Sequence, residues 1–247
     1  MQPADMLKRV FADYVAYRRR RTTGPQGDNP LGQLRTTVPI TRAFGYDRGK
    51  PVDRFFVERY LAAKADSIRG RVLEIGDNEY TLTYGGARVT QSDILHFDAK
   101  NPKATLIGDL SACEHIADAL FDCIILTQTL HLIYDIRAAL ANVHRLLVPG
   151  GTLIATFPGL SQISDEDWGP SWCWGWSRGQ AESLLEATFP LGQIEAEALG
   201  NRFAAAAFLY GLIVEELEQD RLLAPEGGCA FIIGVTAQRA SSGPPRP

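Results

Sequence analysis

Acidic residues and glycines stand where two predicted strands end, a pattern that suits a ligand carrying hydroxyl or amino groups. The apolar run at residues 71–75 carries Glu74 and is followed by Gly76. Seventeen residues after Gly76, Ser92 and Asp93 close the next predicted strand. Ligands of open α/β sheets bind at the carboxyl ends of the strands, where a glycine lets them approach the backbone closely. We therefore predict that Asp93 accepts hydrogen bonds from ribose hydroxyls, with a solvated turn residue as the alternative.

Further polar residues follow the third and fourth predicted strands. Asp109 and Leu110 come after the third strand, and Thr127 and Gln128 end the fourth. His131 lies just beyond, and histidine is the side chain used most often as a general base. We predict that His131 removes a proton at this edge, with a histidine packed into the next helical turn as the alternative.

Short apolar runs alternate with helical patterns from Gly70 onward, which predicts βαβ units and a mostly parallel sheet. Earlier, helical spacing predicts helices over residues 4–22 and from Pro51 to Leu61. A further helix is predicted over residues 136–147, and another within the alanine-rich insertion 203–217. The predicted strands are residues 71–75, 88–90, 104–107, 123–126, 153–157, 194–199 and 230–236.

Composition narrows the class of protein. Of the 247 residues, 45% are hydrophobic and 22% charged, as in globular proteins, and the net charge is −4. An overall pI near 5.6 argues against a dedicated nucleic-acid binder. No apolar stretch reaches the roughly 20 residues of a bilayer span, and no secretory signal is visible, so we expect a cytoplasmic protein. The four cysteines show neither metal-ligand spacing nor a disulfide framework, so no metal is expected.

The order of the motifs resembles the class I S-adenosylmethionine-dependent methyltransferases. An acidic-x-Gly strand end, an acidic second strand, Gly-Asp-Leu, Phe-Asp-x-Ile-Ile and Pro-Gly-Gly-x-Leu follow one another over about residues 70–237. Residues 44–49, 72–81, 123–135 and 158–164 look like one bacterial branch of that family, often associated with glycosyltransferases or natural-product pathways. The resemblance implies an α/β fold: a seven-stranded, Rossmann-like sheet with an antiparallel last strand and helices on both faces.

The resemblance also assigns roles around S-adenosylmethionine. It implies that Glu74, Gly76 and the adjacent Asp77 lie beside the methionine part. Asp93, with Ile94, would hold the ribose, and Asp109 would face the adenine amino group while Leu110 packs nearby. Thr127, next to Gln128, would offer its carbonyl to the methionine ammonium. Each assignment pairs an acceptor with a ligand donor.

One departure from the family pattern concerns the loop after Gly76, where Asp77-Asn78-Glu79-Tyr80 replaces further glycines. Asn78 tolerates left-handed backbone and could still make the turn. Only twelve residues separate Gly76 from Val89, so the first crossover helix must be a single turn or absent. A nicotinamide-binding site fits worse, because it requires G-x-G-x-x-G opening a full helix. The altered loop motivates the alternative function, a non-catalytic methyltransferase-like partner or scaffold.

The acceptor side is predicted from residues outside these motifs. Four tryptophans at positions 168, 172, 174 and 176 either wall an acceptor pocket, plug the sheet edge or form a dimer contact. Arg48 either pairs with the methionine carboxylate or forms a surface salt bridge with Asp47 or Asp53. His96, just past Asp93, is the second candidate base, with a solvent-exposed loop residue as the alternative. The insertion 203–217 either packs on the sheet or forms the face of a homodimer.

Taken together, the sequence predicts a methyltransferase acting on a small, sugar-like or natural-product-like acceptor, with O-methylation preferred. We expect residues 1–69 to form a helical cap, residues 70–240 the methyltransferase domain and residues 241–247 a disordered tail.

Overall fold

The computed structural model describes residues 37–163, 171–190 and 192–241. The predicted helix over residues 4–22, Trp168 and nearly all of the C-terminal tail lie outside this range. Within the described residues, no helix is both long enough and apolar enough to cross a bilayer.

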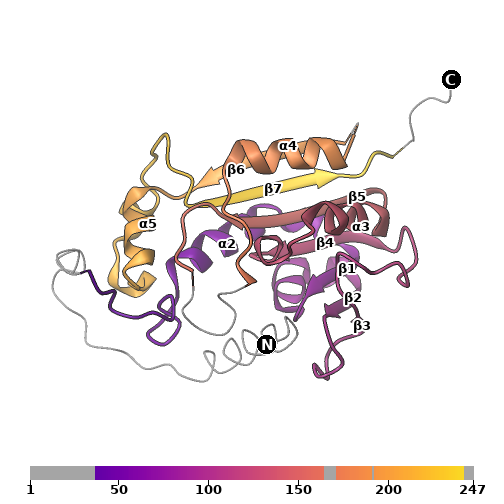
Figure 1. Cartoon of the computed structure of the whole chain (residues 1–247), viewed down its shortest axis with the longest axis horizontal. Coiled ribbons are helices and arrows are strands. Elements are labelled where there is room, and N and C mark those ends of the chain that lie inside the picture. The colour runs from indigo at the N-terminus through magenta and orange to yellow at the C-terminus, as the bar shows by residue number, and fades with distance from the viewer. Residues whose placement is uncertain (1–36, 164–170, 191, 242–247) are drawn as a thin grey trace.

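A seven-stranded sheet with the order β3-β2-β1-β4-β5-β7-β6 forms the centre (Figure 1). Strands β1 to β5 pair in parallel, and β7 runs antiparallel between β5 and β6. This confirms the predicted fold class. The strands are β1 (Gly70–Ile75), β2 (Val89–His96), β3 (Leu106–Ile107), β4 (Phe121–Thr127), β5 (Leu147–Pro158), β6 (Ile194–Leu199) and β7 (Ile232–Gln238).

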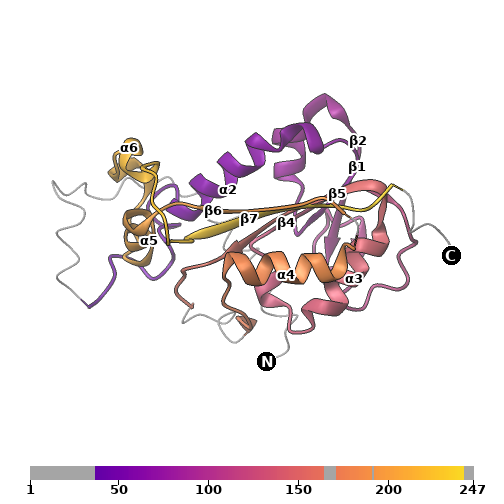
Figure 2. The same ribbon diagram turned by 90° about the horizontal axis from the view of Figure 1, so that it is seen from above.

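Helices cover both faces of the sheet, as Figure 2 shows from above. One apolar cluster lies under α3 and α4, and a second under α2 and α5. Gly234 on β7 lets α2 lie close to the sheet, because a Cβ there would come within 2.6 Å of the Tyr60 ring. The helices are α2 (Val52–Ala63), α3 (Ile136–Leu146), α4 (Arg178–Thr188), α5 (Arg202–Leu209) and α6 (Gln219–Leu222).

The crossover between β1 and β2 is short, but its helical part, residues 79–88, is longer than the predicted single turn. It contains a π-helical turn at Thr81–Gly85 and a 3₁₀ turn at Gly86–Arg88, without a regular α-helix. The prediction that Asn78 turns the chain was wrong. Gly76, with φ of 83°, takes the left-handed conformation instead, and Asn78 is not among the residues with positive φ.

The insertion 203–217 is α-helical only in its first half, and its second half contains a 3₁₀ turn at Val214–Glu216. Helix α5 ends at Leu209, and Gly211 then takes a left-handed φ of 75° against Thr41. The helix packs against α2, and Phe208 stacks on Phe44 with ring centroids 5.6 Å apart. The first half of the insertion is therefore packed against the chain's own α2 and residues near Phe44.

Candidate active site

The carboxyl ends of β1 to β5 form one edge of the sheet, where ligands of such folds bind. In Figure 1, α5 and the indigo segment that precedes α2 lie beyond this edge. We call residues 37–51 the strap. The strap joins the insertion through an antiparallel bridge between Pro51 and Ile213 and through the hydrogen bond from Ile40 N to Tyr210 O.

Glu74 is buried, and its carboxylate holds the turn that follows β1. It accepts hydrogen bonds from the backbone N and Oγ1 of Thr81, both 2.8 Å, and from Tyr80 N at 3.3 Å. Burial raises the pKa of Glu74 to about 8, and the nearby charge of Asp77 adds to the rise. Glu74 therefore shapes the backbone beside Gly76, since its oxygens are already bonded to protein groups.

The residues after Gly76 are also held by side chains. Asp77 Oδ1 accepts from Glu79 N at 3.0 Å, and Asn78 Nδ2 donates to Ser92 Oγ at 3.0 Å. The carbonyl of Gly76 accepts from the buried Asn101 Nδ2 at 2.7 Å. Polar side chains thus replace the family's additional glycines in fixing this loop.

Asp93 does not lie at the end of its strand, contrary to the prediction. It pairs with Leu73 in the register, and its strand continues for three more residues to His96. Its carboxylate is buried, forms an ion pair with Arg71 Nε at 2.7 Å and accepts from Thr105 Oγ1 at 3.0 Å. The neighbouring Ile94 is buried and bonded through its N to Thr105. The Asp93 carboxylate is therefore already paired with protein groups, and its role is structural.

His96 and Asp98 lie where Asp93 was expected. His96, the second candidate base, is buried, and its Nδ1 lies 3.3 Å from Asp98 Oδ1 and 2.9 Å from the Asp98 carbonyl oxygen. Asp98 follows the strand by two residues and keeps part of its side chain exposed. Sequence reasoning missed Asp98. The sequence signal was the apolar pair Ile94-Leu95 directly after Asp93, which indicates that the strand continues beyond Asp93.

Asp109 lies at the end of β3, where the prediction placed it. Its Oδ1 accepts from the N and Oγ of Ser111, at 2.8 and 2.7 Å, which forms a tight turn. Leu110 is buried in the cluster under α3, and its carbonyl accepts from Asn142 Nδ2 at 3.0 Å. Asp109 therefore stands at the edge while Leu110 anchors the loop in the core.

Thr127 and Gln128 end β4 with an unusual backbone. Gln128 has a φ of 47°, a conformation that non-glycine residues adopt rarely and that clusters at functional sites. Its N donates to Thr156 O at 3.0 Å, and the Thr127 carbonyl accepts from Thr129 Oγ1 at 2.9 Å. A carbonyl oxygen has two lone pairs, so Thr127 can accept a second bond.

His131 is buried in a 3₁₀ turn (Leu130–Leu132) after β4, and its Nδ1 has no hydrogen-bond partner. Its ring packs on Trp172, with centroids 4.2 Å apart, and its carbonyl accepts from Cys173 N at 2.9 Å. Burial lowers the pKa of His131 to about 3, so the imidazole is neutral at physiological pH. The structure thus brings His131 and the tryptophan segment together, a contact that the sequence does not reveal.

The tryptophans at this edge differ in surroundings. Trp174 donates through Nε1 to Ile133 O at 2.9 Å and stacks on the exposed Tyr134. Trp176 is buried against Phe157 in the core. Trp172 and Trp174 therefore lie next to His131, whereas Trp176 is a core residue.

Arg48 pairs with none of the groups that the sequence suggested. Its guanidinium forms a bidentate ion pair with the buried Glu216 and donates to Gly211 O at 2.8 Å. The partner lies 168 residues away, so sequence proximity pointed to Asp47 and Asp53 instead. Arg48 therefore fastens the strap to the insertion, and the prediction that it binds the methionine carboxylate is not supported by its geometry.

Comparison with known proteins finds a family match for the central part of the chain. Residues 68–155 match the methyltransferase domain family. Residues 68–155 therefore carry a methyltransferase domain, and the cofactor that such a domain implies is S-adenosylmethionine. A search of curated proteins finds no significant match.

Solved structures, two of them described as methyltransferases, share the fold at low sequence identity. A putative sarcosine dimethylglycine methyltransferase from Galdieria sulphuraria is 14% identical with a TM-score of 0.51, covering 75% of this chain and 85% of its own. A SAM-dependent methyltransferase from Archaeoglobus fulgidus is 12% identical with a TM-score of 0.50, covering 74% and 93%. The [4+2]-cyclase SpnF is 17% identical with a TM-score of 0.51, covering 75% and 82%.

The polar groups at the edge of this methyltransferase domain fit S-adenosylmethionine. The cofactor's ammonium, ribose hydroxyls and adenine amino group are all donors. The edge offers the acceptors in strand order: the Thr127 carbonyl after β4, Asp98 after β2 and Asp109 after β3. Gly76, directly after β1, has a left-handed backbone and no side chain, so a ligand can approach the backbone there. These residues would hold the cofactor.

Proposed function

We propose that the protein transfers a methyl group from S-adenosylmethionine to a hydroxyl of a small, sugar-like or natural-product-like acceptor. The observation that carries this proposal is the match of residues 68–155 to the methyltransferase domain family, on a sheet edge lined with acceptor groups. When bound, S-adenosylmethionine supplies an electrophilic methyl group on a positively charged sulfur.

The residues around the edge would bind and orient the reactants. The Thr127 carbonyl would accept from the ammonium, Asp98 from the ribose and Asp109 from the adenine amino group. Trp172 and Trp174 would form an aromatic wall on the acceptor side, where ring faces favour a neighbouring cation and exclude water. Alignment and desolvation would then supply most of the rate.

His131 is the proposed proton acceptor. Its Nδ1 is buried without a protein partner, and its neutral imidazole is the form that a base requires. A pKa lowered to about 3 makes the protonated ring costly, so we expect a contribution near the lower end of general-base catalysis, about 10²-fold.

The alternative of a non-catalytic scaffold would be supported if Asn78 or Tyr80 filled the space that the adenosine needs. Tyr80 belongs to the apolar cluster under α2 and stacks beneath Arg54, and Asn78 is bonded to Ser92. These contacts draw both side chains into protein contacts and do not favour the scaffold.

Calorimetry with S-adenosylhomocysteine tests the proposal most directly. Asp109→Asn should weaken binding by roughly 10- to 150-fold, because a charge-assisted hydrogen bond contributes on the order of 1.5–3 kcal/mol. The matched control is Asp66→Asn, an exposed residue in the 3₁₀ turn after α2. A wild-type protein that binds no S-adenosylhomocysteine at millimolar concentration would overturn the proposal. Mass spectrometry of hydroxylated acceptors incubated with S-adenosylmethionine would then test the methyl ether product.

A further inference from the structure

The connection between β3 and β4 has no helix or strand of its own to hold it. It runs from Gly108 to Leu120, and its second residue, Asp109, lies at the edge where the adenine amino group is proposed to bind. Gly108 N donates to His96 O at 2.9 Å, which fixes the loop on one side of Asp109. On the other side, the carbonyl of Leu110 is bonded to a side chain of α3.

That side chain is Asn142, which is buried. Its Nδ2 donates to Leu110 O at 3.0 Å, whereas its Oδ1 accepts from Arg145 Nε at 3.3 Å and Nη2 at 3.2 Å. Because a guanidinium only donates, Arg145 forces the amide oxygen of Asn142 toward itself and the amide nitrogen toward Leu110. The two residues together determine which way the donor points.

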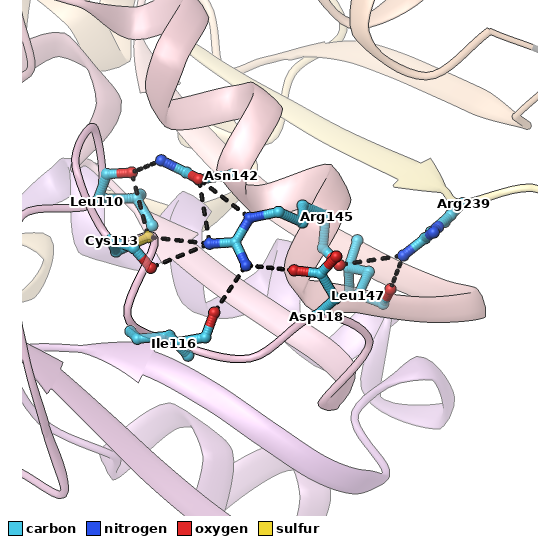
Figure 3. A network of polar contacts seen from close by, with 8 residues as sticks. All are labelled: Leu110, Cys113, Ile116, Asp118, Asn142, Arg145, Leu147 and Arg239. Carbon is cyan, nitrogen blue, oxygen red and sulfur yellow. Dashed lines mark hydrogen bonds and ion pairs between the residues drawn. The ribbon is translucent and has the colours of Figure 1, made fainter.

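Arg145 also holds the rest of the same loop, as Figure 3 shows. Its guanidinium donates to Ile116 O at 2.7 Å and to Cys113 O at 3.0 Å, and it forms an ion pair with Asp118. The loop backbone is bonded to the end of α3 as well, through Leu120 N and Leu146 O at 2.8 Å. Helix α3 therefore sets the position of a loop that lacks regular structure.

We propose that Asn142, oriented by Arg145, is a positioning residue that aligns Asp109 for recognition of the adenine amino group. The inference rests on the proposed function. Asn142 lies outside the motifs that carry the family resemblance, and it acts through one carbonyl adjacent to Asp109. Its loss should therefore change how well the protein distinguishes adenine from a related base, in addition to any loss of stability.

The test compares S-adenosylhomocysteine with S-inosylhomocysteine, in which an oxygen replaces the adenine amino group. In S-inosylhomocysteine an acceptor faces Asp109 in place of a donor. Wild-type protein should therefore bind S-inosylhomocysteine about tenfold or more weakly than S-adenosylhomocysteine. With Asn142→Leu, a substitution of similar volume, the ratio of the two dissociation constants should fall to about three or less, because Asp109 is no longer aligned. Arg145→Lys, which keeps the charge but loses the forked donor, provides a milder second variant.

Asn201→Leu is the matched control. Asn201 is also buried and donates to backbone carbonyls, those of Arg221 in α6 at 2.8 Å and Ala224 at 3.0 Å, but it is the N-cap of α5 and lies outside the β3–β4 connection. We expect it to lower Tm and leave the ratio at the wild-type value. If folded Asn142→Leu and Arg145→Lys keep the wild-type ratio of dissociation constants, the inference is overturned and the proposed function is not affected. A wild-type ratio near one would do the same, whereas failure of wild-type protein to bind either ligand would overturn the proposed function and the inference with it.

Discussion

His131 combines a buried ring with a nitrogen that has no protein partner. A buried polar atom without a hydrogen bond is costly, and such atoms are frequent at functional sites. The ring also contacts Trp172, so a loss of packing and a loss of proton transfer must be separated by experiment.

His131→Ala should reduce kcat about 10²-fold and leave the Kd of S-adenosylhomocysteine nearly unchanged, because the residue acts on the acceptor. The deficit should shrink at high pH, where an ionised acceptor needs no base. Because the pKa of His131 is lowered to about 3, this residue should cause no fall in wild-type rate between pH 5 and 8. Single-turnover rates check both expectations, with His144→Ala, whose ring packs against Phe189, as the control. A wild-type rate in His131→Ala would reassign the histidine to packing.

At the scale of elements, the order of strands and helices was predictable, whereas their ends were not. The Gln-Ser-Asp sequence at residues 91–93 interrupts the apolar run of β2, and the prediction ended the strand there. The strand continues because Arg71 neutralises Asp93 from the neighbouring β1, a contact between residues 22 positions apart. This single error displaced the proposed ribose partner from Asp98 to Asp93. Contacts between distant segments, such as Arg48 with Glu216, leave no periodic signal in a sequence.

The attachment of the strap to the insertion gives a prediction at this scale. The Glu216 side chain is only 5% exposed. Arg48→Met removes its cation and leaves a buried carboxylate without a charged partner. Breaking a buried ion pair typically costs about 3–5 kcal/mol. We expect a lower Tm, faster proteolysis within residues 37–51 and an increased KM for the acceptor. Lys50→Met removes the partly exposed pair with Glu58 and should change Tm little.

A double variant, Arg48→Met with Glu216→Leu, tests whether the unpaired Glu216 carboxylate causes the loss of Tm. It removes both charges, so it should recover part of the Tm that Arg48→Met loses. Equal Tm values for Arg48→Met and wild-type protein would show that the ion pair does not hold the strap.

At the scale of the whole molecule, the sheet separates two apolar clusters, and two carboxyl groups packed on these layers have raised pKa values. Glu74 belongs to β1 in the centre of the sheet, and Asp53 to the first turn of α2. Asp53 lies on the same helical stripe as Val57 and Leu61, which are 2% and 0% exposed. Burial raises the pKa of Asp53 to about 6 and that of Glu74 to about 8. These raised pKa values make the global stability depend on pH.

The direction follows from proton binding. Glu74 has a higher pKa when folded than its ordinary value of 4.5, so the folded state binds more protons than the unfolded state between about pH 4.5 and 8. Its contribution to stability is fully present below pH 4.5 and is lost as the pH rises through about 8. Urea unfolding at constant ionic strength should therefore give a lower free energy of unfolding at pH 8 than at pH 5. In Glu74→Gln this decline should be smaller, because the amide does not titrate, whereas Glu186→Gln on the exposed side of α4 should keep the wild-type slope. An unchanged slope in Glu74→Gln would mean that Glu74 is not protonated in the folded protein at neutral pH, and that its bonds to Thr81 stabilise the carboxylate more than burial destabilises it.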